Sequence, residues 1–272
     1  MNRRTRRFLP VVLLSVLLAL PGALPWAQSA SDSEGRVVAA YAISHGVVQS
    51  DPAVSVAAAD QRYYDLVEMY VWNALPPDAK AMISRLELFV STSSAEDATD
   101  GTATENDDGV TWTLALDEGE GESAVLGGKP DDRAVFDEVI AHEVGHVLSL
   151  NESQRADTAE PGGYADSEGS FTRGAYLSRF YARFWRSRHP HGSARQEADQ
   201  ASARLDGDPD AFVTDYAATD PSEDFAESFA YFVLGSSPRG SVEKDRKIEF
   251  FYDYPDLVRD RDYLRRGLSS TK

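Results

Sequence analysis

The sequence predicts an α+β protein that is mainly helical, with a small mixed sheet before its longest helix and a helical C-terminal half. Residues 83–91 and 110–116 alternate apolar and polar side chains, as strands with one buried face do. Residues 132–150, 175–186 and 221–234 carry apolar side chains at helical spacing. Because both predicted strands precede these helices, the sheet belongs to the front half of the chain.

The domain organisation is predicted to be simple. No long linker and no internal repeat divides the chain, so we expect one domain over residues 30–272. Its halves would be an N-terminal lobe of about residues 36–150 and a helical C-terminal lobe of about residues 151–272.

In the front half, apolar residues recur at helical spacing over residues 53–75, and Pro76 and Pro77 end that helix. Residues 91–109, between the two strands, are polar, acidic and glycine-containing, which predicts a solvated loop. The acidic residues 117–122 predict a second solvated loop, and the chain then leads into the longest helix, which begins near Asp131 or Asp132.

In the back half, residues 152–170 are polar and rich in glycine, which indicates another loop. Residues 175–186 predict an aromatic amphipathic helix. A polar helix ending at Leu205, a helix over residues 221–234 and two helices in the last thirty residues complete the expected elements.

Composition excludes several classes of function. The 272 residues include 27 Lys+Arg, 45 Asp+Glu and no cysteine, and the formal net charge is −18. We expect no nucleic-acid partner and no membrane contact beyond the N-terminal leader, because both need clusters of basic residues. Without thiols, disulfides and thiolate metal sites are excluded, so a metal would be bound by His, Asp or Glu.

The first thirty residues have the pattern of a secretory signal peptide. Four arginines within the first seven residues precede an apolar run of 13 residues, Phe8 to Leu20. That run is shorter than the roughly 20 residues that span a bilayer, and small residues before position 31 offer cleavage sites. We expect a signal peptide over residues 1–29 and a secreted or extracytoplasmic mature protein. An uncleaved signal anchor extending to about Ala27 is the alternative.

A metal-binding motif lies on the longest predicted helix. His142, Glu143 and His146 form the pattern H-E-x-x-H. Side chains four residues apart share one face of an α-helix, so both imidazoles can reach one cation. Zn²⁺ accepts imidazole nitrogens and, with three protein ligands, keeps a position for water, from which Glu143 can take a proton. The alternative, a helix with two surface histidines, is disfavoured by the apolar residues that flank the motif.

A third ligand must come from elsewhere in the chain. The continuation H-E-x-x-H-x-x-G-x-x-H fails, because this chain has Ser149 and Glu152 where Gly and His are needed. Glu152 itself remains a weaker candidate, since the chain would have to turn sharply without glycine.

Two glutamates further along are stronger candidates. Asp220 can cap a helix that starts at Pro221, and Glu223 and Glu227 then share one face. One carboxylate can bind zinc while the other accepts the outer N–H of a ligating histidine. We favour Glu223 as the ligand. The alternative gives Glu223 a capping-box role and leaves Glu227 on the surface.

The H-E-V-G-H motif followed by an E-x-x-x-E helix resembles the gluzincin branch of the zincin metallopeptidases, and within it the catalytic domain of anthrax-lethal-factor-like metallopeptidases. The resemblance covers residues 138–150 and 214–232. It implies a zincin-like two-lobed catalytic domain. It also implies these roles: zinc ligands His142, His146 and Glu223, general base Glu143, supporting carboxylate Glu227, and oxyanion donor Tyr216, which stands seven residues before Glu223.

The sequence thus predicts a secreted zinc metallopeptidase that hydrolyses peptide bonds through a zinc-bound water, with Glu143 as general base. We expect a protein or peptide substrate and a monomeric enzyme. One alternative is a non-catalytic extracellular protein whose zinc is structural, with a fourth ligand such as His189 or Glu227. Another is a binding module that keeps a degenerate protease fold.

Other features are predicted to be structural. His189 and His191 flank a proline in an exposed loop, and His45 is expected in the core or at a strand edge. The acidic residues 206–210 do not fit the twelve-residue calcium loop and predict a turn. The aromatic residues of 171–185 are expected in the core.

Overall fold

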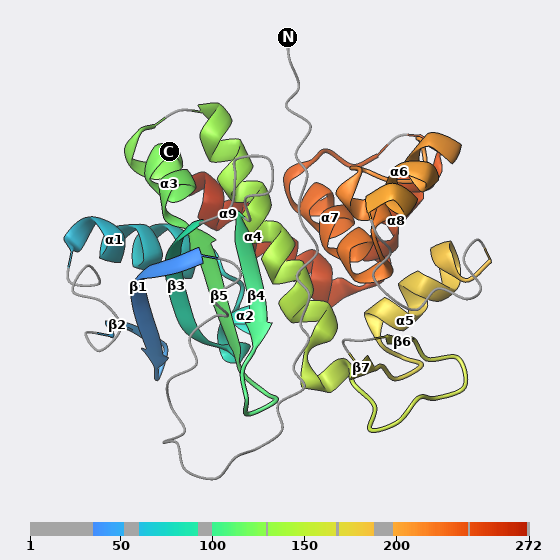
Figure 1. Cartoon of the computed structure of the whole chain (residues 1–272), viewed down its shortest axis with the longest axis horizontal. Coiled ribbons are helices and arrows are strands. Elements are labelled where there is room, and N and C mark those ends of the chain that lie inside the picture. Colours follow the sequence, from blue (N-terminus) through green and yellow to red (C-terminus); the bar gives the residue numbers. More distant parts are fainter. Residues whose placement is uncertain are drawn as a thin grey trace.

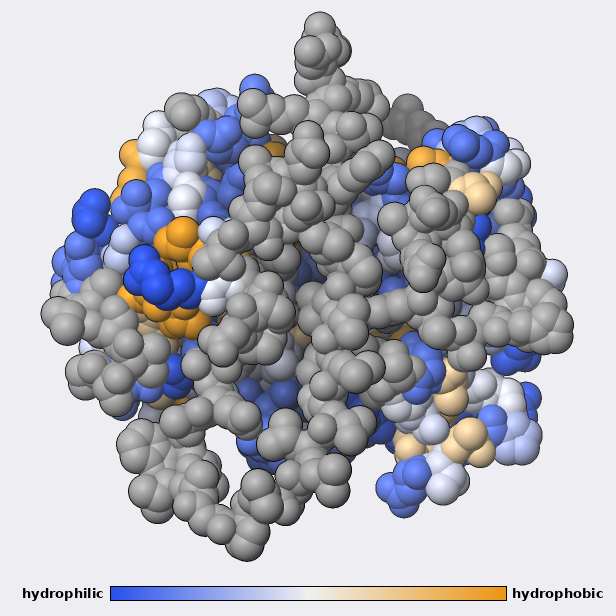
Figure 2. Space-filling model, viewed as in Figure 1, coloured by the Kyte–Doolittle hydropathy of each residue, from blue (hydrophilic) through white to orange (hydrophobic). Residues whose placement is uncertain are grey.

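The protein has a mixed α+β architecture, with a sheet on one side and most helices on the other (Figure 1). The computed structural model describes residues 35–51, 60–91, 100–128, 130–166, 169–187, 198–238 and 240–270. The predicted signal peptide and both His189 and His191 lie outside these ranges. None of the described helices is long and apolar enough to cross a membrane. The described surface in Figure 2 is mostly hydrophilic, in keeping with the acidic composition.

Five strands form a mixed sheet in the order β2-β1-β3-β5-β4. The strands are β1 (Gly35–Ser44), β2 (Val47–Ser50), β3 (Ile83–Ser91), β4 (Gly101–Glu105) and β5 (Trp112–Asp117). β3 and β5 run parallel and the other neighbouring pairs are antiparallel. β3 and β5 confirm the two predicted strands, because their leucines alternate toward the core. A two-stranded ribbon, β6 (Ala165–Asp166) and β7 (Gly169–Ser170), lies in the segment predicted as a loop.

The first hairpin turns through two residues in the left-handed region, His45 (φ 52°) and Gly46 (φ 77°). Two-residue turns of this kind match the right-handed twist of antiparallel strands. His45 is therefore exposed in the turn between β1 and β2, and the expectation of a core or strand-edge position is wrong.

Two predicted loops are wrong. Within residues 91–109, of which 92–99 lie outside the described ranges, residues 101–105 form β4, an edge strand paired with β5. Within residues 117–122, α3 (Glu118–Gly121) replaces the loop, and Glu122 begins η3 (Glu122–Leu126). The sequence did not predict β4, because its residues, GTATE, include no large apolar side chain that would mark a buried face. Small residues are required there, because a Cβ on Gly101 would lie 2.5 Å from Cγ1 of Val139.

The helices follow the predicted order. They are α1 (Gln61–Asp65), continuing as the π-helix η2 (Leu66–Trp72), α2 (Pro77–Met82), α4 (Pro130–Leu150), η4 (Glu152–Gln154), α5 (Tyr176–Phe180), continuing as η5 (Tyr181–Trp185), α6 (Ala198–Gly207), η6 (Tyr216–Ala218), α7 (Pro221–Leu234), α8 (Glu243–Phe250), η7 (Phe251–Asp253) and α9 (Pro255–Ser270). α4, α5 with η5, and α7 confirm the three strongest helix predictions. α8 and α9 confirm the two expected at the C-terminus.

α4 lies between the sheet and α7 (Figure 1). Its C-terminal half is buried throughout, so the H-E-x-x-H motif is not on a surface helix. An aromatic cluster fixes α7 against the helices behind it, and its fully buried members are Phe180, Phe225, Phe229, Phe232 and Phe251. Among residues 171–185, five aromatic side chains are buried as predicted, while Tyr176 is partly exposed.

Candidate metal centre

The two histidines of the motif meet on the face of α4 that is turned toward α7. His142 and His146 lie one helical turn apart, and both are at least nine-tenths buried. Their Nε2 atoms are 3.0 Å apart and their ring centroids 4.7 Å apart. Burial of two imidazoles at this separation needs a shared partner, either a carboxylate or a cation.

Glu223 supplies a carboxylate from the first turn of α7. Its Oε2 lies 3.2 Å from Nε2 of His142 and 3.2 Å from Nε2 of His146. Asp220 caps the helix, because its Oδ1 accepts from the backbone N–H groups of Ser222 and Glu223 at 2.8 and 3.0 Å. The capping role is thus filled by the aspartate, and the Glu223 side chain turns to the histidines. The alternative of a capping box at Glu223 is wrong.

These three donors form the one group of three or more His, Asp or Glu side chains, within the described ranges, that could hold a metal ion. The spacing fits a small ion. Three ligands at about 2.1 Å from one centre with tetrahedral angles are about 3.4 Å apart. The separations here are 3.0–3.2 Å, so a slight opening of the cluster accommodates the ion. Two nitrogens with one carboxylate suit a first-row transition metal better than Ca²⁺ or Mg²⁺.

The electrostatics of the cluster tie metal binding to pH. Burial alone would lower the pKa of His142, but its hydrogen bonds with Glu223 and Glu227 raise that pKa well above the ordinary value. Burial would also lower the pKa of His146, but the charge of Glu223 and its hydrogen bond with His146 raise that pKa above its ordinary value. The two imidazoles in turn hold the pKa of Glu223 below its usual range in spite of burial. A metal ion must therefore displace protons from the imidazoles when it binds.

Glu227, one turn after Glu223, orients the first histidine. Its Oε1 lies 2.7 Å from Nδ1 of His142, and its Oε2 accepts from the hydroxyl of Thr214 at 2.6 Å. Glu227 is 2% exposed, so the alternative of a surface position is wrong. A carboxylate on the outer nitrogen fixes the imidazole tautomer and directs Nε2 into the cluster. Nδ1 of His146 has no hydrogen-bond partner among the described residues.

The segment that carries Tyr216 is tied to the same carboxylate. The backbone N–H of Ala217 donates to Oγ1 of Thr214 at 3.0 Å, and Thr214 donates to Glu227. The Tyr216 ring lies 5.9 Å from the His142 ring, and the side chain is buried. Burial raises the pKa of Tyr216 well above its usual value, and the neighbouring carboxylates, Glu223 first, raise it further. The phenol therefore keeps its proton and can act as a donor.

Glu143 lies beside the cluster, on the side of the sheet. It is 5% exposed, and a Cβ on Gly101 of β4 would lie 3.4 Å from its Cγ. Its charge contributes to the raised pKa of both histidines and of Tyr216. Glu143 is thus one of the charged groups that act on the cluster.

The structure also identifies residues that the sequence analysis did not single out. A Cβ on Gly145 would lie 3.0 Å from Cα of Ala226, so the glycine in the motif lets α7 approach α4 closely. Thr214 is the second residue of this kind, because its hydroxyl links Glu227 to the segment that carries Tyr216. A glycine in the interior of a long helix is a sequence signal for such a crossing, whereas nothing in the sequence marks Thr214.

Other candidates lie away from the cluster. Glu152 is exposed on η4, and the idea that it is the third metal ligand is wrong. Ser149 is buried and donates to the backbone oxygen of Gly145 at 2.8 Å. The turn predicted over residues 206–210 is confirmed only in its second half, because residues 206 and 207 end α6 and the turn follows, closed by the backbone N–H of Ala211, which donates to the backbone oxygen of Asp208 at 3.0 Å.

Comparisons with known proteins give little beyond this geometry. No protein-family model matches the chain, and no curated protein matches it. A solved structure from Bacteroides caccae ATCC 43185, provisionally described as a zinc-binding metallo-peptidase, is similar to this chain over 77% of its residues and 75% of the other chain. The sequence identity is 18% and the TM-score is 0.40.

Proposed function

We propose that this protein is a zinc-dependent metallopeptidase of the gluzincin type. The observation that carries the proposal is the convergence of His142, His146 and Glu223, from two helices, on one buried point with separations of 3.0–3.2 Å. Two imidazoles and one carboxylate are a donor set of catalytic zinc sites, in which a fourth position stays open. The metal would lower the pKa of a bound water and polarise the carbonyl of the scissile bond.

The protein's own groups then have distinct tasks. Glu143 would take the proton of the attacking water and pass it to the leaving amine. Tyr216, whose pKa is raised, would donate its hydroxyl proton in a hydrogen bond to the developing oxyanion. Glu227 would hold His142 in the tautomer that binds metal.

A peptide substrate is supported by the edge strand beside the cluster. β4 is the last strand of the sheet, so its outer edge has no strand partner among the described residues. Its Gly101 lies close to Glu143. An extended peptide can add to such an edge through backbone hydrogen bonds, which would bring its carbonyl groups past the cluster.

We also propose that residues 1–29 direct export and that residues 30–272 act as one domain and as a monomer. The basic and apolar pattern of the leader supports the first part. Intact-mass measurement of the protein recovered outside the cytoplasm would give a cleaved N-terminus near residue 30. Recovery of the full-length chain with the membrane fraction would favour the signal anchor.

The catalytic claim is tested by Glu143→Gln, with Glu152→Gln as the matched control. Zinc content and cleavage of a peptide library are measured for both variants and for the wild type. We expect Glu143→Gln to retain zinc and lose cleavage, while Glu152→Gln behaves as the wild type. Zinc retained by all three proteins with no cleavage by any would support the structural-zinc alternative. Equal cleavage by all three proteins would show that Glu143 is not the general base.

A further inference from the structure

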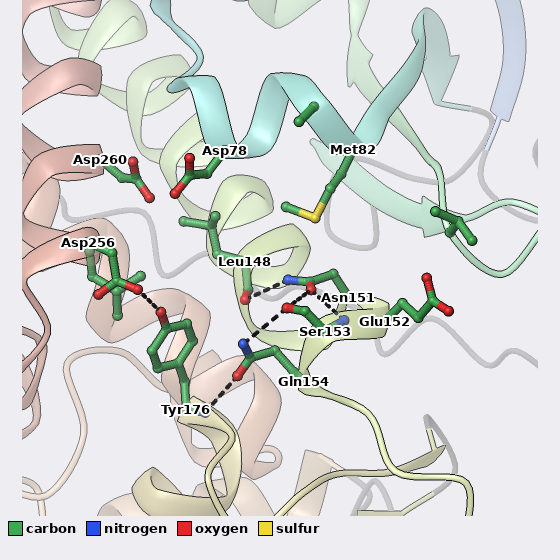
Figure 3. A pocket seen from close by; sticks show the side chains of 13 residues that line it. Asp78, Met82, Leu148, Asn151, Glu152, Ser153, Gln154, Tyr176, Asp256 and Asp260 are labelled. Atoms are coloured by element: carbon green, nitrogen blue, oxygen red, sulfur yellow. Dashed lines mark hydrogen bonds between the residues drawn. The ribbon is translucent and has the colours of Figure 1, made fainter.

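A second cavity, of about 450 Å³, opens among α2, the end of α4, the start of α5 and α9 (Figure 3). That volume is within the range of small-molecule sites, about 300–1,000 Å³. One part of its lining is apolar: Ala81, Met82, Val110, Leu148 and Leu257. Three aspartates line another part: Asp78, Asp256 and Asp260. No lysine or arginine lines the cavity.

The cavity is separate from the metal centre. Leu148 lies two residues after His146, which is a rotation of about 200° around the helix axis. The two sites therefore use opposite faces of α4. A ligand in the cavity would contact neither the histidines nor Glu223.

Asp260 is the unusual residue of this cavity. It is 1% exposed, and its Oδ1 has no hydrogen-bond partner among the described residues. The nearest cationic nitrogen, Nε of Arg259, is 3.7 Å away, and the NH2 group of that arginine bonds to Asp78 at 2.6 Å. Figure 3 shows the carboxylates of Asp260 and Asp78 turned toward one another. A buried carboxylate in this position requires a proton or a cation.

We propose that this cavity binds an organic cation, an ammonium or guanidinium group on an apolar stem, with Asp260 as its buried counter-ion. The apolar lining would pack against the stem, and the aspartates would accept hydrogen bonds from the cationic head. Both a basic side chain of a peptide and a free diamine have this chemistry.

The spacing of the aspartates argues against a bare metal ion. The ligand atoms of Asp78, Asp256 and Asp260 do not all lie within 4.8 Å of one another, whereas those of the metal centre do. An ammonium or guanidinium group has three to five N–H donors and reaches acceptors that are further apart.

The charge of Asp260 also sets the pH at which binding occurs. Burial first, and then the charge of Asp78, raise the pKa of Asp260 to about 7, although the charge of Arg259 opposes the shift. The charged and titratable groups that face it are Asp78 from α2, Asp256 and Arg259 from α9, and Tyr176 from α5, which bonds to Asp256. Glu152 of η4 also lines the cavity, with its carboxylate on the opposite side from Asp260 (Figure 3). Cation binding should therefore strengthen as the pH rises through 7, because the ionised carboxylate is the binding form.

The proposal is tested by titration calorimetry on the full chain at pH 8 and constant ionic strength. The ligands are 1,5-diaminopentane, Nα-acetyl-lysine N-methylamide and, separately, CaCl₂. The variants are Asp260→Asn and the control Asp262→Asn, which changes an aspartate on the same helix that is paired with Arg261 outside the cavity. We expect saturable binding of an amine to the wild type, at least about tenfold weaker binding to Asp260→Asn, and no change in Asp262→Asn.

Each outcome decides the question. Preference for the diamine identifies a free polyamine as the ligand class, and similar affinities for both amines identify a basic side chain. Tighter binding of calcium than of either amine would overturn the proposal in favour of a metal site. Absence of saturable binding of either amine at pH 8 would overturn the proposal. An equal loss in both variants would show that the attraction comes from the acidity of the whole protein. Glu143→Gln should bind the amines as the wild type does, so this result does not depend on the peptidase proposal.

Discussion

Replacement of Glu227 by glutamine tests how far the outer carboxylate supports the metal centre. Glu227 makes two short hydrogen bonds, 2.7 Å to His142 and 2.6 Å to Thr214, and its side chain is buried. Glutamine keeps the shape and one acceptor, but it replaces two charge-assisted bonds by neutral ones. We expect a 10- to 100-fold loss of zinc affinity, which is about 1.4–2.7 kcal/mol.

The control for this variant is Thr214→Val, which removes one of the two hydrogen bonds and leaves the carboxylate charged. Its expected loss is smaller, about 0.5–1.5 kcal/mol, or roughly two- to tenfold in affinity. Zinc dissociation constants are measured by competition with a chelating dye, and unfolding of the metal-free variants in urea checks the fold. Wild-type affinity in Glu227→Gln, or a larger loss in Thr214→Val, would refute the role assigned to Glu227.

Five further predictions rest on the same geometry. Tyr216→Phe should lower kcat about 100- to 1,000-fold with KM and zinc content unchanged, if the phenol is the oxyanion donor that we propose; an unchanged kcat in steady-state kinetics would contradict this. Apparent zinc affinity should rise with pH between 6 and 9, by up to about tenfold per unit for each proton displaced. The same raised histidine pKa values stabilise the metal-free protein below the unfolded pKa of about 6.5, and this contribution is lost as the pH rises through the folded values. Dye competition measures the zinc affinity, and urea unfolding measures the stability of the metal-free protein, across this pH range. A zinc affinity or a stability that does not change with pH would contradict the corresponding prediction. Gly145→Ala should lower the free energy of unfolding in urea by about 1–3 kcal/mol, because the new methyl group would contact Ala226. An unchanged free energy of unfolding would mean that α4 and α7 can move apart without loss of stability. Lys247→Met should cost about 3–5 kcal/mol, because Lys247 lies 2.5 Å from the fully buried Asp224, and the double variant with Asp224→Asn should regain much of the loss.

The elements that the sequence predicted well are those whose local chemistry and burial agree. α7 begins at Pro221 behind an aspartate whose side chain accepts from two backbone N–H groups, as the cap pattern indicates. In β3, Leu86 and Leu88 join the core, as the alternating sequence pattern indicates, although the middle of the strand is buried on its other face as well. In both cases a pattern within about ten residues fixes the element.

The elements that were missed depend on neighbours far along the chain. β4 is a strand because it pairs with β5 and leaves room for α4, and its own residues are small and polar. At the metal centre, H-E-x-x-H places two imidazoles by helical geometry alone. The choice between Glu223 and Glu227 depends on how α7 crosses α4 at Gly145, which spacing along one helix does not specify.

Anomalous diffraction at the zinc edge, from crystals of the zinc-loaded wild type, tests the central proposal most directly. We predict one peak about 2.0–2.2 Å from Nε2 of His142, Nε2 of His146 and a carboxylate oxygen of Glu223, with a non-protein ligand at the remaining position. A peak bound by four protein side chains, or one that lies away from these three residues, would contradict the proposal.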